Sequence, residues 1–147
     1  MAITQAMCTS FKVLQLTGGT NAIDFSAGTT QTFKIALYTS TATLSAATTA
    51  YTTSNEVANG NGYTTGGKLV TVSQVPTSTG TTAYMNFADV TWSVTSITAR
   101  GALIYRVGGA NDAIAVMVFG EDKQTNGADF VVRFPTDDQN NAILRFS

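Results

Sequence analysis

The sequence contains no histidine, and its only cysteine is Cys8. Without histidine the chain cannot form a Ser-His-Asp or Cys-His triad or a histidine-ligated zinc site, and it lacks the commonest general base. A single cysteine excludes an intramolecular disulfide and a cysteine-rich zinc site. We therefore predict a protein that is not an enzyme and has no catalytic residues, no cofactor-binding residues and no metal ligands. Cys8 is expected to be a small buried hydrophobic residue rather than a nucleophile.

Charged residues are also scarce. They make up 12% of the 147 residues, with eight Lys and Arg against nine Asp and Glu, for a net charge of −1. A soluble domain typically has about 25%. This balance gives no electrostatic basis for binding nucleic acid or an anionic membrane, so neither is expected as a partner. Weak repulsion between copies favours assembly, although a plain neutral domain has the same composition.

Long apolar runs are missing as well. No run approaches the roughly 18 residues that span a bilayer. The first five residues, MAITQ, lack the basic and long apolar regions of a secretory signal. We expect the chain to be made and to fold in a cytoplasm, from which a virion component would be released by lysis.

The sequence does contain many apolar segments rich in threonine, whose β-branched side chain favours strands. These segments are bounded by Gly, Asn and Asp, which indicates strands joined by turns. We predict an all-β protein, with a single β-sandwich or jelly-roll-like domain over residues 1–147, a helix or arm in 1–20 and the sandwich in 21–147. About eight strands are expected, at residues 32–38, 69–72, 82–88, 90–94, 102–105, 114–119, 130–134 and 142–146.

The N-terminal region has a helical pattern. Met7, Phe11 and Leu14 recur at three- and four-residue spacings. Thr4 is available as N-cap and Gly18 as terminator, so the pattern predicts a short helix over residues 4–16.

Four segments are predicted to be turns or loops. The Thr-, Ser- and Ala-rich residues 39–53 have too little apolar area for a core strand, so we expect a surface excursion followed by a helical turn at 54–57. Residues 58–67 contain four glycines but lack a P-loop pattern, which predicts a simple loop. Pro76 and the residues up to Gly80 predict a turn. Residues 120–127 predict a polar hairpin loop.

Trp92 is the only tryptophan. Val90, Trp92 and Val94 share one face of an alternating strand, which predicts that Trp92 anchors the core. The alternative is an exposed ring that stacks on a sugar.

Two pairs of adjacent carboxylates are present, Glu121 with Asp122 and Asp137 with Asp138. Neighbouring side chains on an extended strand point apart, so neither pair forms a glycosidase dyad by itself.

The residues Asp122, Gln124, Asn126 and Gly127 imitate the start of an EF-hand loop. Its twelfth position is Arg133 instead of an acidic residue, and strands flank it instead of helices. We favour a polar hairpin loop, with a weak calcium site completed by Asp129 as the alternative.

The four arginines in or beside predicted strands are expected to pair with acidic residues between strands or between subunits, rather than to bind phosphate. They are Arg100, Arg106, Arg133 and Arg145.

Several segments spread over nearly the whole chain carry a family resemblance: MAITQAMCTSFK (1–12), TFKIALY (32–38), ATTAYTTSNEV (47–57), FADVTW (87–92) and ITARGA (97–102). Through them the chain resembles small virion structural proteins of tailed bacteriophages, of the capsid decoration (cement) type. Residues 18–21, GGTN, depart from the family's local pattern and leave the geometry after the helix open.

The resemblance implies a β-rich protein on the virion head surface that assembles with itself, as a trimer, and binds the major capsid protein. The N-terminal arm and residues 39–67 would then make the contacts with other subunits and with the shell. A different hypothesis is a tail or baseplate module that recognises a host-surface glycan, with Tyr51, Tyr63, Tyr84 or Trp92 as the stacking ring.

Overall fold

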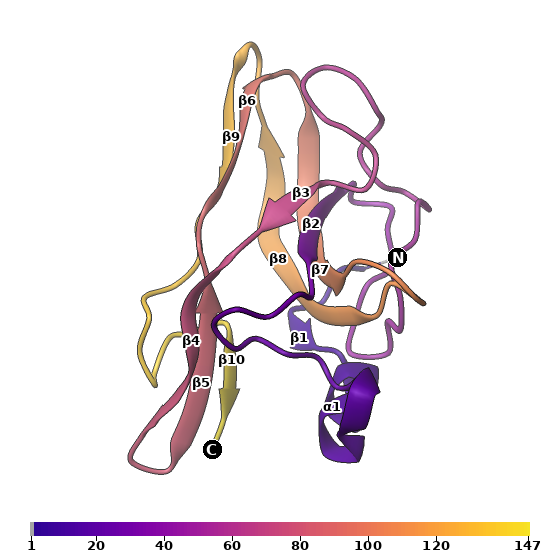
Figure 1. Ribbon diagram of the computed structural model, residues 1–147. Helices are drawn as coiled ribbons and strands as arrows, with labels where there is room; N and C mark the ends of the chain where they lie inside the picture. Colours follow the sequence, from indigo (N-terminus) through magenta and orange to yellow (C-terminus); the bar gives the residue numbers. More distant parts are fainter. Residues whose placement is uncertain (1) are drawn as a thin grey trace.

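In the computed structural model, which describes residues 2–147, antiparallel sheets pack together and one short α-helix lies near the N-terminus (Figure 1). The prediction of an all-β fold with an N-terminal helix is confirmed, and the arrangement is sandwich-like. The helix is α1 (Thr9–Thr17), followed by a 3-10 turn η1 (Gly19–Asn21) in the segment whose geometry the resemblance had left open.

The largest sheet has five strands, and we call it the platform. Its order is β1 (Ala6–Met7), β8 (Ala113–Gln124), β7 (Thr98–Arg106), β2 (Phe33–Tyr38) and β3 (Lys68–Val70). A three-stranded sheet, called the arm, has the order β10 (Leu144–Phe146), β5 (Thr82–Phe87) and β4 (Val72–Thr79). The third sheet pairs β6 (Val90–Thr95) with β9 (Ala128–Val132).

The core lies between these sheets and under α1. Phe25 is packed against both Phe33 of β2 and Phe87 of β5, with ring centroids 5.1 and 5.8 Å apart, so it joins platform and arm. Phe11 reaches the same cluster from α1. Trp92 is buried beside Phe130, which confirms its predicted role as a core anchor.

The arm extends away from the rest of the molecule, and its β4–β5 hairpin projects beyond the end of the platform (Figure 1). β4 is exposed along most of its length, whereas the second half of β5, which ends at Phe87, is buried. The hairpin turn is therefore supported only at its base.

The predicted start of the helix at residue 4 is wrong. Ala6 and Met7 form β1 and pair with Val116 and Ala115 of β8. Cys8 has extended backbone and stands at the N-cap, so the helix begins only at Thr9. Backbone pairing with the edge of β8 outweighs the helical spacing of the side chains here, because unpaired edge groups gain hydrogen bonds.

The turn predicted around Pro76 also lies elsewhere. β4 runs through Pro76 to Thr79, and the chain reverses at Gly80, whose φ is +60°. Proline is tolerated because β4 is an edge strand and its register with β5 shifts between Gln74 and Thr77.

Most of the predicted loop 120–127 is strand. β8 continues to Gln124, and the reversal is confined to residues 125–127. Gly120, with φ +81°, lies where the register shifts between the pairs Gly101–Val118 and Ala99–Lys123. The glycine therefore serves a bulge inside a long strand, a role that a turn signal does not reveal.

A bulge also changes the face of β6. Val94 has φ +52° and is 71% exposed, so it does not share the buried face of Val90 and Trp92 as predicted. Thr95 is buried in its place, and its hydroxyl donates to the Ala128 carbonyl at 2.9 Å.

Residues 39–67 contain no strand in the structure, only isolated bridges, as expected for an excursion and a glycine loop. Residues 54–57 form a simple turn rather than a helical one, with Asn55 at positive φ. The excursion is not wholly superficial, because Leu44 and Val57 are buried. Leu44 accepts a backbone hydrogen bond from Thr4, so the excursion holds the N-terminal segment in place.

Candidate binding groove between strands β8 and β9

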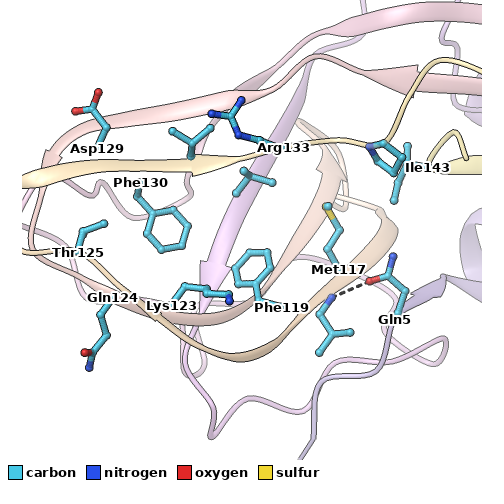
Figure 2. Close-up of a pocket in the computed structure, with 14 residues that line it drawn as sticks. Gln5, Met117, Phe119, Lys123, Gln124, Thr125, Asp129, Phe130, Arg133 and Ile143 are labelled. Carbon is cyan, nitrogen blue, oxygen red and sulfur yellow. Dashed lines mark hydrogen bonds between the residues drawn. The ribbon is translucent and has the colours of Figure 1, made fainter.

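The largest structural opening on a regular surface lies between two consecutive strands. β8 and β9 are linked by the short turn 125–127, yet β8 belongs to the platform and β9 pairs with β6. The two strands therefore diverge, and a groove of about 470 Å³ lies between them. We call it the seam groove (Figure 2). Its lining comes from the N-terminal segment, from β8 with the following turn, and from β9 with the segment beyond it: Gln5, Met117, Val118, Phe119, Lys123, Gln124, Thr125, Asp129, Phe130, Val131, Val132, Arg133, Pro135 and Ile143.

The floor of the seam groove is apolar and aromatic. Phe119 of β8 and Phe130 of β9 approach each other across the groove, with centroids 6.1 Å apart (Figure 2). Phe130 is supported from below by the edge of Trp92. The rings join the inner faces of the diverging strands, so the groove has a rigid base rather than opening into the core.

The walls of the groove are strand edges. On the outer side of β8, β1 pairs with only Val116 and Ala115. Next to them, the side-chain oxygen of Gln5 accepts a hydrogen bond of 2.8 Å from the Val118 backbone N–H (Figure 2). Within residues 2–147, no strand pairs with the outer side of β8 beyond this point, or with the side of β9 that faces away from β6. Such edges recognise another extended backbone.

Charged groups stand at the rim and are paired outside the groove. Lys123 lies 2.6 Å from Glu121, and its hydrogen bond is the main cause of a lowered pKa of the Glu121 carboxyl. Arg133 lies 3.6 Å from Asp89 and remains largely exposed. Asp129 accepts a hydrogen bond from the Val94 N–H. The rim thus carries both signs, without a concentration of one charge.

The predicted calcium-like pattern is not gathered into a site. Asp122 forms a 2.8 Å ion pair with Arg100 on the neighbouring strand, and Asp129 is engaged with the Val94 N–H. The sequence spacing mimicked a loop, but an extended strand and a short turn separate the oxygen atoms that a calcium ion would need. In the part of the chain that the structure describes, no three Asp, Glu, Cys or His side chains group as metal ligands.

The carboxylates of Asp137 and Asp138 have separate partners, as their adjacency predicted. Asp137 accepts hydrogen bonds from Asn86 and Ser73, which ties the segment before β10 to the arm. Asp138 accepts from Thr136, Asn140 and Asn141, and these hydrogen bonds lower its pKa to about 2. Both groups hold the chain in place, and the two carboxylates do not act together on one site.

Three of the four arginines pair with acidic residues as predicted. Arg106 pairs with Asp112 across the β7–β8 turn, in addition to the Arg100 and Arg133 pairs described above. Arg145 instead donates to the backbone carbonyl of Asn140.

The candidate sugar-stacking rings are mostly committed to the fold. Tyr63 and Trp92 are buried, and Tyr51 is stacked on Tyr105 with centroids 4.6 Å apart. Tyr84, on the arm, is half-buried. No cluster of exposed aromatic rings is therefore formed by these four residues.

The sequence reasoning missed a hydrogen-bonded centre at Glu56. Its carboxylate accepts from the Tyr63 hydroxyl at 2.6 Å, the Tyr51 hydroxyl at 2.7 Å and the Gly66 N–H at 2.7 Å. Burial, and secondly the hydrogen bond to Glu56, raises the pKa of both tyrosines. The Tyr63 hydroxyl also accepts from the Leu37 N–H, so the centre fastens the loop to β2. No local sequence pattern marks such a centre.

Comparisons with known proteins identify no relative: no family model, no curated protein and no solved structure matches this chain. Among the described residues, no helix combines the length and apolar character required to cross a membrane.

Proposed function

We propose that the protein is a structural component of a tailed-bacteriophage virion, without enzymatic activity. In this proposal it assembles with itself on the surface of the mature head and stabilises the lattice of the major capsid protein. The observation that carries the proposal is the seam groove, where two unpaired strand edges flank an aromatic floor. A groove of this kind favours binding of an extended protein segment over chemical transformation of a small molecule.

The mode of attachment follows from the groove. An extended segment of the major capsid protein would add a strand to β8 or β9 and place alternate side chains over Phe119 and Phe130. Main-chain hydrogen bonds would supply affinity, and the aromatic floor would select apolar side chains. The weakly charged surface leaves little repulsion against a dense array of copies.

Stabilisation of the head would arise from mass action. A protein that binds only the expanded shell lowers the free energy of that state by an amount that grows with its concentration relative to Kd. Repetition of the same contact around the shell multiplies the effect without requiring a strong individual interaction.

The first test is to locate and count the protein in purified virions, by cryo-electron microscopy and quantitative mass spectrometry. We expect density on the outer head surface and a copy number that matches the shell lattice. A handful of copies at the tail tip would contradict the proposal and favour the glycan-binding alternative.

The attachment site is tested with a matched pair of variants. Val131→Lys places a charged side chain in the seam groove, whereas Val94→Lys places one on the exposed face of β6 outside it. In co-sedimentation with undecorated mature capsids, we expect roughly tenfold weaker binding for Val131→Lys and unchanged binding for Val94→Lys. Equal binding of the two variants would show that the shell contacts another surface.

A further inference from the structure

A second apolar opening lies where α1 meets the arm. This pocket has a volume of about 120 Å³. Its walls come from the helix, the segment after it and strands β5 and β10: Phe11, Phe25, Tyr84, Met85, Leu144 and Phe146. An apolar cavity of about 150 Å³ in another protein stays dry and accepts benzene, so this pocket is of a size for one aliphatic side chain.

The one amide in the lining does not make the pocket polar. The Gln15 side chain donates to the Ile23 carbonyl at 3.0 Å and accepts from the Ile23 N–H at 2.7 Å. Both of its polar ends are therefore used inside the fold. The pocket offers no strong polar group that would favour a charged or sugar ligand.

A matching side chain is found next to the pocket. Leu16 is 89% exposed on α1, with exposed Val13 one turn before it. Leu16 is the residue after Gln15, so it stands at the pocket's margin but contributes nothing to its lining. An aliphatic side chain this exposed makes little contribution to folding and gains about as much as a core residue when a partner covers it.

We infer that a second copy of this chain covers this face, with Leu16 of one copy inserted into the α1–arm pocket of the next. The leucine side chain has the size and the chemistry that the pocket accepts, and the chain's low charge opposes close approach only weakly. Phe146, half-exposed at the pocket's edge, would be covered by the same contact. The inference rests on the self-assembly in the proposed function and assigns its contact residues.

The test is the molar mass of the full-length protein in solution, without capsids, measured by light scattering over a concentration series. Leu16→Gln keeps a good helix former at an exposed position, and we expect it to weaken self-association roughly tenfold or more. The control is Leu69→Gln, which removes another exposed leucine from the far edge of the platform and should leave the mass unchanged. A wild-type protein that stays monomeric, or a Leu16→Gln variant with wild-type mass, would overturn the inference.

A cross-link tests the contact directly. Ala83 also lines the pocket, so a mixture of Leu16→Cys and Ala83→Cys proteins is expected to form an intermolecular disulfide under mild oxidation, while Leu69→Cys with Ala83→Cys is not. Oligomers that persist without the first cross-link would exclude this contact. Capsid binding is measured separately: oligomers found away from the head would contradict the proposed function alone, and head binding by a protein whose mass ignores Leu16 would contradict this inference alone.

Discussion

The platform and the arm are both antiparallel sheets, but they are stabilised to very different degrees. In the platform, β2 and β7 are covered on both faces, and residues such as Leu37, Leu103 and Ile104 are fully buried. In the arm, β4 is largely exposed and the hairpin extends beyond the core. A sheet with one partly covered face is expected to open locally before the platform does, which suits an element that contacts partners.

The largest contrast is expected from core truncation. Leu103→Ala removes a fully buried side chain from the middle of β7 and should lower the free energy of unfolding by about 2–5 kcal/mol. Val75→Ala, on the exposed β4, should change it by less than about 1 kcal/mol. Urea denaturation followed by Trp92 fluorescence gives both values. Similar losses for the two variants would show that the arm is as integral to folding as the platform.

Two glycines sharpen the comparison at the level of the backbone. Gly67 has φ +80°, and a Cβ there would lie 1.9 Å from the Ile35 carbonyl oxygen of β2. Gly67→Ala should therefore destabilise the protein by about 2–4 kcal/mol, through both the unfavourable φ and the collision with the platform.

Gly80, at the tip of the arm, has φ +60° but open space around it. Gly80→Ala is expected to destabilise by only about 1–2 kcal/mol. Thermal unfolding by circular dichroism measures both. If the two variants had equal melting temperatures, close packing of the Gly67 loop on β2 would be ruled out as a source of stability.

The Glu56 centre provides the next smaller effect. Glu56→Gln keeps the shape but replaces a carboxylate that accepts three hydrogen bonds, so a loss of about 1–3 kcal/mol is expected. Glu121→Gln, an exposed carboxylate paired only with Lys123, should have almost no effect. Hydrogen exchange should accelerate at Leu37 and Gly66 in the first variant only. Unchanged protection there would mean that the loop is held by its apolar contacts instead.

The same contrast explains what the sequence could predict. Alternating apolar residues located β2 and the central parts of β7 and β8, because burial on a regular strand leaves a periodic trace. Trp92 and Cys8 were placed in the interior correctly on residue type and context. In these regions the local pattern and the tertiary structure favour the same conformation.

The errors concentrate where backbone geometry departs from the regular period. Gly120 and Val94 occupy bulges, and a sequence pattern cannot distinguish a bulge from a turn or foresee the change of face. β1 depends on an edge of β8 that is more than a hundred residues away in the chain. The seam groove has the same origin, since it exists only because β8 and β9 join different sheets.

The smallest predicted effect lies at Asp138, in the connection that leads into β10 of the arm. Hydrogen bonds from Thr136, Asn140 and Asn141 favour the ionised carboxyl and lower its pKa from 3.8 to about 2. Because the folded pKa lies below the unfolded one, this contribution is complete above pH 3.8 and is lost as the pH falls through about 2.

The carboxyl is exposed, so the loss should loosen its turn without unfolding the platform. In two-dimensional NMR spectra recorded from pH 5 downward, the Asn140 and Asn141 amides are expected to shift with a midpoint near 2 while platform amides stay unchanged. Asp138→Asn removes the titrating group and should abolish that midpoint. A concerted shift of arm and platform amides would show instead that the two sheets respond to acid as one cooperative unit.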